Sequence, residues 1–566
     1  MKLILREYLA SLKERGELDA ILPDLLSEVG FNVYSRPERG TAQHGVDVAA
    51  VGTDDDGEQK LFLFSVKQGD LTRQDWDGTP QALRSSLNEI QDVYIPTRVS
   101  NEHKHLSVVV CLCFGGDVQE QVRSALTGYI NQRTTKHLSF REWNGDKLAE
   151  MLLRGVLRED ILPKPLRASF QKAVAMTDEP DVSYFHFSNL SRHLTKDVQQ
   201  SEKQRVTAAR QLYVCLWILF VWARDNKNLD APYRASELAL LAVWDLLRPF
   251  INKKTRAAAA ISLVLHQLID LHLIISFELL EQKVIPHVGK RDGLSVAIPT
   301  RSSADINLKL FDFLGRIAMT GLWLVWLASR NNNEFEGQLK EKISEWTTSC
   351  FPMIQNNRAL FLPLCDEHAI EVCLLLLLVA FGDSSRQDAI AWLREMSNLL
   401  DITIRTHGKY PTIFKDYADL VDHPREQTDA YREEATSGSI LIPLLAAWLT
   451  AFDERASLET LESLANSVLN HCTLQLWLPD NSTEEALYNG GHGHGVALCD
   501  LPIVADGENL LKVIADACKK ENACEGLSAM TTGYWPIVLL ACRHYRHPVP
   551  PHFWIDGLKP KAPNPP

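Results

Sequence analysis

The sequence predicts an α/β domain at the N-terminal end of the chain, followed by a large all-α region. Over the first 160 residues, segments with the two-residue period of a β-strand alternate with segments of helical period. From about residue 185 to the end, almost every long segment has the helical period alone. At 566 residues the chain is also longer than one hydrophobic core usually organises, so we expect two to four domains.

The elements of the N-terminal domain follow the order α-β-β-β-α-β-α-β-α, which is typical of a small mixed sheet flanked by helices. A first helix is expected within residues 7–31, where apolar residues recur at helical spacing up to Gly30. Thr79 and Pro80 mark the start of a second helix, because Thr caps helices well and Pro fits the first helical position. The predicted strands are 32–35, 46–52, 60–68, 106–114 and 136–143, and the later helices are 80–94, 115–132 and 144–157.

The rest of the chain divides by composition. Prolines and charges with weak periodicity at 163–184 predict a linker, which places the first domain at 1–162 and a helical region at 185–556. The proline-rich end, 557–566, is predicted to be disordered. Within the helical region, helices are predicted at 204–225, 235–251, 256–277, 305–330, 334–349, 366–381, 385–401, 457–471 and 507–520.

Composition narrows the classes of function. The chain is 45% hydrophobic and 23% charged, as is usual for a soluble globular protein, and its net charge is −13. This charge argues against a protein that coats nucleic acid nonspecifically, because such binding requires a basic surface. The first 165 residues hold 20 Lys and Arg against 25 Asp and Glu, so any nucleic-acid contact there depends on a local patch.

The cysteines and the apolar runs indicate where the protein resides. Eleven cysteines are scattered without a paired framework or zinc-like spacing, which favours reduced thiols and a cytoplasmic location. The apolar runs 212–223, 319–328 and 372–382 are each shorter than the roughly 20 residues that a membrane span requires. We therefore expect buried helices and no membrane association.

A charged residue ends the most apolar strand. In 61–67, "LFLFSVK", Lys67 shares a face with Leu61, Leu63 and Ser65, and a buried ammonium needs a partner. Alternation places Asp47 with Ala49 and Val51 on the preceding strand, so in a hairpin Asp47 can face Lys67.

This pairing suits phosphodiester hydrolysis. The Asp47 carboxylate, aided by the backbone carbonyl of Val66, can hold a hard divalent cation such as Mg²⁺ or Mn²⁺. The cation lowers the pKa of a bound water, and Lys67 can orient that water or neutralise the charge of the transition state. The structural alternatives are that Asp47 caps a turn and that Lys67 extends to water from a strand end.

At these residues the sequence resembles the PD-(D/E)xK nuclease superfamily, most closely its Mrr-like restriction endonuclease branch. That family carries an acid on a first helix, then Gly-hydrophobic-Asp on a strand, then an acid or Gln, any residue, and Lys on the next. Here "HGVDVAA" supplies Asp47 and "FSVKQG" supplies Lys67, and Asp19 falls where the helix places its acid. The resemblance covers about residues 15–155 and implies a restriction-endonuclease-like fold, a divalent metal and a nucleic-acid substrate, with DNA favoured over RNA.

The sequence departs from the family at two positions. Ser65 stands where the family has Asp, Glu or Gln, and Gln68 is a candidate catalytic residue that can partly replace it. Asp19 is one carbon shorter than the usual Glu, and Asp24 and Glu28 compete for the same role. Asp19 also fits a plain surface position, and Gln68 fits a polar loop.

Two functions follow from these residues. The first is a metal-dependent endonuclease whose helical region senses a trigger, binds a protein partner or forms a homo-oligomer, by analogy with bacterial restriction and anti-phage effectors. The second is a catalytically degenerate module that binds nucleic acid or protein as a scaffold. Elsewhere, His492, His494 and Cys499 are candidates for a metal site, although a flexible Gly-rich loop with exposed imidazoles fits the stretch better, and 543–553 is a candidate anion-contacting or packing segment.

Overall fold

The computed structural model divides the chain into two compact units. The first comprises Met1–Ala239 and Thr255–Leu268, and the second comprises Leu240–Lys254 and Ile269–Pro566. The structure describes residues 5–6, 9–10, 12, 14, 18–36, 43–54, 56–154, 164–196, 201–330, 336–382, 385–407, 411–423, 428–491, 494–499, 501–504 and 508–558.

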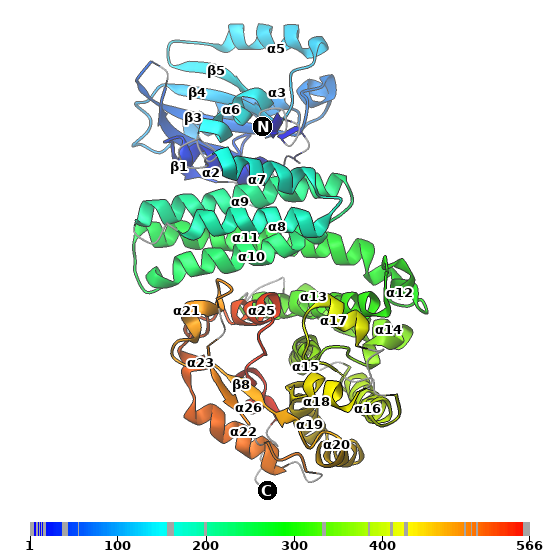
Figure 1. Ribbon diagram of the computed structural model, residues 1–566. Helices are drawn as coiled ribbons and strands as arrows, with labels where there is room; N and C mark the ends of the chain where they lie inside the picture. The colour runs from blue at the N-terminus through cyan, green and yellow to red at the C-terminus, as the bar shows by residue number, and fades with distance from the viewer. Residues whose placement is uncertain are drawn as a thin grey trace. The chain divides into compact units, whose positions relative to one another are not determined.

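A five-stranded mixed sheet organises the N-terminal part of the first unit (Figure 1). Its strands are β1 (Asn32–Ser35), β2 (Val48–Thr53), β3 (Gln59–Lys67), β4 (Val108–Phe114) and β5 (Leu138–Trp143), and they lie in chain order. The pairs β1–β2 and β2–β3 are antiparallel, whereas β3–β4 and β4–β5 are parallel. The predicted strands and the mixed sheet are confirmed, with shifts of one or two residues at most strand ends.

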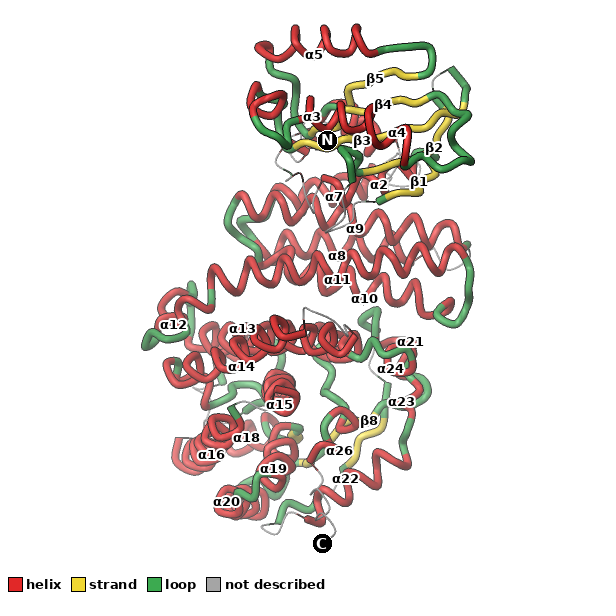
Figure 2. The backbone as a smooth tube through the Cα atoms, turned by 180° about the vertical axis from the view of Figure 1, so that it is seen from behind, coloured by secondary structure: helices red, strands yellow, loops and turns green. Residues whose placement is uncertain are grey.

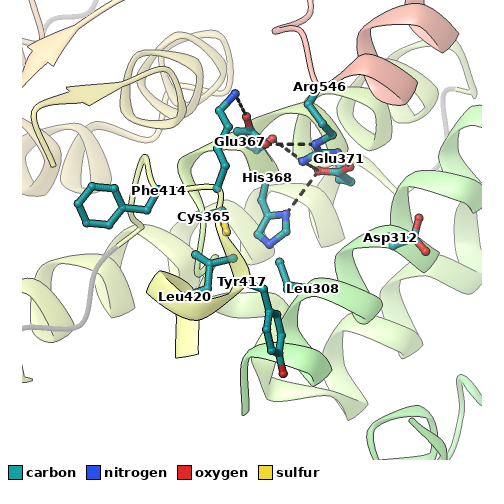
Figure 3. Close-up of a pocket in the computed structure, with 11 residues that line it drawn as sticks. Leu308, Asp312, Cys365, Glu367, His368, Glu371, Phe414, Tyr417, Leu420 and Arg546 are labelled. Carbon is teal, nitrogen blue, oxygen red and sulfur yellow. Dashed lines mark hydrogen bonds and ion pairs between the residues drawn. The ribbon is translucent and has the colours of Figure 1, made fainter. Parts of the chain in front are cut away.

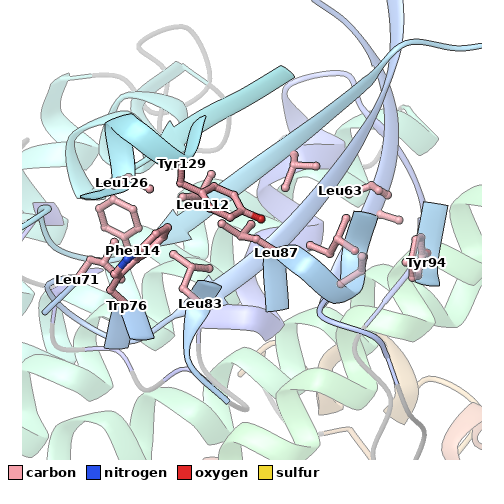
Figure 4. Close-up of a cluster of buried hydrophobic side chains, with 14 of the residues drawn as sticks. Leu63, Leu71, Trp76, Leu83, Leu87, Tyr94, Leu112, Phe114, Leu126 and Tyr129 are labelled. Atoms are coloured by element: carbon pink, nitrogen blue, oxygen red, sulfur yellow. The ribbon is translucent and has the colours of Figure 1, made fainter. Parts of the chain in front are cut away.

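One face of the sheet packs against the helices that connect the parallel strands. Leu63 of β3 and Leu112 of β4 join Leu87 of α3 (Leu83–Glu89) and Leu126 of α5 (Glu120–Arg133) in one buried cluster (Figure 4). Two parallel strands need such a crossover, since no short turn can connect them. The alternation of β3 supplies the apolar side chains of this face.

The opposite face is aromatic. The Phe62 ring packs edge-on against Phe31, with the ring centroids 5.0 Å apart, and Phe64 packs in the same way against Trp143 at 4.9 Å. The first helix, α2 (Asp19–Glu28), contacts β1 and β2, and α6 (Gly145–Arg154) follows β5. With both faces covered, β3 is a central strand, as its run of apolar residues predicts.

The segment predicted as a linker is helical instead. From residue 164 on it forms α7 (Lys164–Ala175) and the first residues of α8 (Pro180–Lys196), which pack on each other and on α9 (Glu202–Asp225). Pro165 and Pro180 occupy the first turns of these helices, where a missing N–H costs nothing, so the prolines begin helices here. Of the tail predicted from 557, residues 557 and 558 end α26 (Ile555–Leu558), and the rest lies outside the described residues.

The remainder of the chain is largely helical, as predicted (Figure 2). Helices α10 (Asp230–Leu247) and α11 (Arg256–Lys283) contribute to both units. The helices of the second unit include α13 (Ser303–Arg330), α14 (Glu336–Asn356), α15 (Ala369–Gly382), α16 (Arg386–Ile402), α17 (Tyr417–Asp422), α19 (Leu441–Ala451), α20 (Arg455–Ser467), α22 (Glu508–Lys520) and α25 (Pro536–Tyr545). Short strands β8 (Leu476–Leu478) and β9 (Val496–Leu498) pair with each other.

Three helices are long and apolar enough to cross a membrane by length and composition: Glu202–Asp225, Arg256–His287 and Ser303–Arg330. Two of them contain the apolar runs 212–223 and 319–328, so the prediction that these runs are too short to span a membrane is wrong. In Glu202–Asp225 and in Ser303–Arg330, 78% of the most apolar window is buried within the protein. The absence of membrane association stays a prediction.

A glycine at the end of β4 tests how tightly the N-terminal segment packs on the sheet. A Cβ at Gly115 would lie 1.8 Å from the backbone oxygen of buried Leu9. We predict that Gly115→Ala lowers the free energy of unfolding by more than about 2 kcal/mol, measured by urea denaturation, because backbone cannot yield as a side chain does.

Gly128→Ala is the matched control. Gly128 lies in α5 with nothing within 4 Å of its Cβ position, so alanine should stabilise the helix by about 0.5–1 kcal/mol. Equal stability of the two variants would show that the contact between Leu9 and Gly115 does not form.

Candidate functional site

Asp47 lies at an irregularity where β2 begins. Val48 faces Phe64 across the β2–β3 ladder, and the N–H of Asp47 also donates to the Phe64 carbonyl at 2.8 Å. Two residues therefore face one, which is the arrangement of a β-bulge. As a result Val46, and not Asp47 as alternation predicted, joins Ala49 and Val51 in the core cluster. The bulge turns the Asp47 side chain out of that face.

The turn before Asp47 requires glycine. Gly45 has a φ of +79°, and a Cβ there would lie 2.3 Å from the backbone oxygen of Ser86. Both conditions exclude other residues at this position. The Gly-Val-Asp sequence therefore has a local structural reason, which holds independently of any metal.

The Asp47 carboxylate is bound to the next strand. Its Oδ2 accepts a hydrogen bond from the Val66 N–H at 2.7 Å. Burial raises the pKa of this carboxyl to about 6, against the lowering effects of the Val66 N–H and the Lys67 ammonium. The carboxylates of Glu14 and Asp19 raise it further. Asp47, Lys67, Glu14 and Asp19 thus interact electrostatically at one place.

Lys67 makes its ion pair with Glu14. Its Nζ lies 3.1 Å from Glu14 Oε1, and its side chain is only 13% exposed. The Lys67 charge still acts on Asp47, so the two predicted residues share one electrostatic environment. Sequence reasoning missed Glu14. Its position five residues before Asp19, in the same charged stretch, was the available signal.

Asp19, Asp24 and Glu28, the three candidates for the acid of the first helix, have different surroundings in the structure. Asp24 is buried and lies 3.5 Å from the Arg36 guanidinium, and burial raises the pKa of Asp24 despite Arg36 and Arg210 nearby. Glu28 pairs with Arg210 of α9 at 2.7 Å. Half-buried Asp19 is the one of the three that acts on Asp47. This placement agrees with the predicted role of Asp19 without testing it.

The third strand provides the remaining predicted positions. Val66 is buried, and its N–H and carbonyl point to the same neighbouring strand, because one residue of an antiparallel pair directs both groups to its partner. Its carbonyl therefore points toward the side occupied by Asp47, while Val46 directs its own N–H to Gln43. Ser65 is buried one residue earlier, and Gln68 is exposed just past the strand end.

These residues offer a hard cation its preferred oxygen donors. Mg²⁺ is commonly held by one or two carboxylates, with water and substrate phosphate completing its shell. Asp47, an acid of the first helical segment and the Val66 carbonyl fit that requirement. Within the ranges that the structure describes, no three His, Cys, Asp or Glu side chains come together to hold an ion. The protein would therefore supply Mg²⁺ or Mn²⁺ with few ligands, near the smallest number that such ions take from proteins.

The other candidate segments lie in the second unit. His492 lies outside the described residues, and the His494 carbonyl accepts a hydrogen bond from Thr483 at 2.7 Å. Cys499 follows β9. The segment 543–553 contacts anions of the protein itself, since Arg543 lies 2.6 Å from Asp312 and Arg546 pairs with Glu367 at 3.4 Å.

Comparisons with models of protein families, with curated proteins and with solved structures find no match to this chain.

The raised pKa of Asp47 predicts a pH-dependent stability. A folded-state pKa near 6, against 3.8 in the unfolded chain, means that the folded protein binds the proton more tightly. Stability in EDTA should therefore fall as pH rises from about 4 to 6 and stay lower above that. Asp47→Asn cannot ionise at this position. The variant should therefore unfold at a higher temperature than the wild type at pH 7.5, and at the same temperature as the wild type at pH 4.

The measurement is thermal unfolding by circular dichroism at both pH values in EDTA. The expected gain at pH 7.5 is about 3 kcal/mol, since the pKa differs by about two units at 1.36 kcal/mol each. Asp54→Asn serves as contrast, because Asp54 is buried in ion pairs with Lys60 and Arg141 and its loss should destabilise the protein. A loss of stability in Asp47→Asn at pH 7.5 would indicate that Asp47 is a structural cap.

Proposed function

We propose that the chain is a divalent-metal-dependent endonuclease that hydrolyses phosphodiester bonds of nucleic acid. The observation that carries the proposal is the Asp47 carboxylate, which is bound to the Val66 N–H and lies within electrostatic reach of Lys67, Glu14 and Asp19. Perturbed carboxylates that gather beside a lysine are common at functional sites, and here Asp47 and Lys67 lie at the ends of two neighbouring strands with Glu14 and Asp19 close to them. The sheet and its flanking helices support the restriction-endonuclease-like assignment, and the motif resemblance favours DNA.

The chain's residues divide the chemical work. Asp47 and the Val66 carbonyl, with Asp19 or Glu14, are the groups that would hold Mg²⁺ or Mn²⁺. The bound ion supplies positive charge to the scissile phosphate and lowers the pKa of a water. Lys67 orients the attacking water or neutralises charge on phosphorus, while Glu14 fixes the position of its ammonium. Gln68, which is exposed just past the strand end, would contact the substrate.

The helical part offers a route for regulation. Glu28 at the end of α2 pairs with Arg210 of α9, so the helix that carries Asp19 is attached to the helical layer of the same unit. A shift of α9 would move α2 and change the distance from Asp19 to Asp47. We therefore propose a cytoplasmic restriction or anti-phage effector whose helical region, through a protein partner or a second copy, controls cleavage; the cellular role rests on analogy of architecture.

A second function is favoured by a specific observation. Ser65 occupies the position of the family's second acid, and no group of three metal-ligating side chains forms among the described residues. These facts fit a nuclease-fold module that binds nucleic acid or protein without cutting. The two functions differ in one measurable property, the hydrolysis of a phosphodiester bond.

We predict that the wild-type protein cleaves at least one of plasmid DNA, single-stranded DNA and RNA in Mg²⁺ or Mn²⁺. Asp47→Ala should abolish detectable cleavage because the principal metal ligand is lost. Lys67→Ala should reduce the rate by about 10²–10³ through loss of transition-state stabilisation. Product formation on denaturing gels over time gives both rates.

Lys104→Ala is the matched control for Lys67, since Lys104 is an exposed lysine of the same sheet domain. Equal cutting by wild type and both site variants would assign the activity to another site or to a contaminant. If the wild type cuts none of the three substrates, including after addition of lysate from phage-infected cells, the nuclease proposal fails and the scaffold function is favoured.

Glu14 yields a separate prediction. Glu14→Gln keeps the side-chain shape but removes the charge that holds Lys67, so the cleavage rate should fall about tenfold and the Mg²⁺ requirement should rise. Rates measured across a Mg²⁺ titration separate the two effects. Glu89→Gln, at an exposed position of α3, is the control, and an unchanged titration in Glu14→Gln would remove Glu14 from the site.

A further inference from the structure

One arginine of the helical layer faces two acids of α2, the helix that carries Asp19. Asp24 and Glu28 lie four residues apart on α2, which places them on the same face of the helix and about 6 Å apart along its axis. Arg210 of α9 donates from Nη1 to Glu28 Oε1 at 2.7 Å. Burial raises the pKa of Asp24, and the guanidiniums of Arg36 and Arg210 oppose this rise. The Arg210 guanidinium therefore acts on two successive turns of α2.

The hydrogen bonding of Asp24 is incomplete. This residue is only 1% exposed, yet its Oδ2 has no hydrogen-bond partner within the ranges that the structure describes. Its Oδ1 lies 3.5 Å from the Arg36 guanidinium, which is longer than most hydrogen bonds. Arg210 Nε is also buried without a partner among the described residues, as is Gln267 Oε1 of α11. An unpaired acceptor of Asp24 and an unpaired donor of Arg210 thus belong to one buried cluster.

Arg210 has two arrangements of similar free energy. On Glu28 it makes a short hydrogen bond between charged groups, and it leaves Asp24 Oδ2 and its own Nε unpaired. On Asp24 it would pair both of these buried atoms and release Glu28, whose side chain is 11% exposed and reaches solvent more easily than Asp24 does. A charge-assisted hydrogen bond and the penalty of an unpaired buried polar atom are of similar size, so neither arrangement excludes the other.

Pro23 separates these two acids from Asp19. A proline has no N–H to donate to the carbonyl four residues earlier, which here belongs to Asp19, so the first turn of α2 is joined to the rest by one hydrogen bond fewer. Sharp bends in helices occur at such positions. Because α2 packs on α9, a movement of the later turns of α2 against α9 can change the angle of the turn that carries Asp19.

We propose that Arg210 is a positioning residue that exchanges between Glu28 and Asp24, and that this exchange sets the distance from Asp19 to Asp47. With Arg210 on Glu28, as observed, the Asp19 carboxylate lies near enough to oppose the ionisation of Asp47. With Arg210 on Asp24, α2 shifts against α9, as helices do in other switching proteins, and Asp19 leaves the site. The proposal rests on the proposed metal site and names the residue through which the helical layer regulates it.

Crystal structures of the full-chain wild type and of Glu28→Gln test the exchange directly. Glutamine keeps the length of the side chain but removes the charge that holds Arg210. The guanidinium should therefore move to Asp24 in the variant, with Nε within about 3 Å of Asp24 Oδ2. An Arg210 side chain that keeps its place in the variant overturns the exchange, as does a water that bridges Asp24 and Arg210 in both proteins.

Mn²⁺ binding by the full chain, measured by isothermal titration calorimetry, tests the positioning. Glu28→Gln should weaken Mn²⁺ binding by about fivefold, because Asp19 leaves the site. Asp24→Asn should leave Mn²⁺ binding unchanged, because of the two acids only Glu28 then remains to pair with Arg210. A purely structural role of these acids predicts the opposite order, since Asp24 is the more deeply buried of the two.

Asp181→Asn is the matched control, since Asp181 pairs with Arg234 at 2.5 Å in the same unit and joins α8 to α10 without contacting α2 through this pair. Its Mn²⁺ affinity should equal that of the wild type. Equal losses in Glu28→Gln and Asp24→Asn, or no loss in Glu28→Gln, overturn the positioning role. If the wild type binds no Mn²⁺, the proposed metal site fails, while the two crystal structures still decide whether Arg210 exchanges.

Discussion

The hydrogen bond from the Val66 N–H to the Asp47 carboxylate connects the start of β2 to the end of β3. It holds Asp47 near Lys67, Glu14 and Asp19, the charged residues of the candidate site. The bulge at Asp47 leaves Val66 without a backbone acceptor in register, and the side chain takes that place at 2.7 Å. A hydrogen bond to a charged acceptor contributes about 1.5–3 kcal/mol. That gain stays below the cost of burying the carboxylate, because the pKa of Asp47 is still raised to about 6.

A raised pKa does not by itself separate a site from a cap, because burial also raises the pKa of Asp366, whose carboxylate accepts hydrogen bonds from Ser439 and from the Ile440 N–H. Asp47 differs in that the carboxylates of both Glu14 and Asp19 lie near enough to oppose its ionisation. Like charges kept together at a cost to stability are expected where a bound cation relieves the repulsion.

The sequence predicted the sheet well because its signals are local. The alternation of apolar and polar residues, bounded by glycines and prolines, predicted each strand. For example, β1 was predicted at Asn32–Ser35, as observed. The bulge escaped prediction because one extra residue in a strand leaves no mark on composition, and it reversed the face assigned to Asp47. Glu14 escaped because its contact with Lys67 spans 53 residues. The prediction of a linker at 163–184 was wrong, because prolines in the first turn of a helix look the same in sequence as prolines that interrupt one.

A pocket in the second unit could not have been predicted from sequence for the same reason, since His368, Lys415 and Arg546 of its lining come from separate segments (Figure 3). The segment 543–553 was predicted only to contact anions or to pack, and its arginines pair with Asp312, Glu367 and Glu371 of the protein itself. Those pairs hold the walls in place and leave Lys415 as the exposed cation of the lining. Salt bridges within the protein therefore hold the walls of this pocket in place, and neither ring nitrogen of the buried His368 beside them has a hydrogen-bond partner among the described residues.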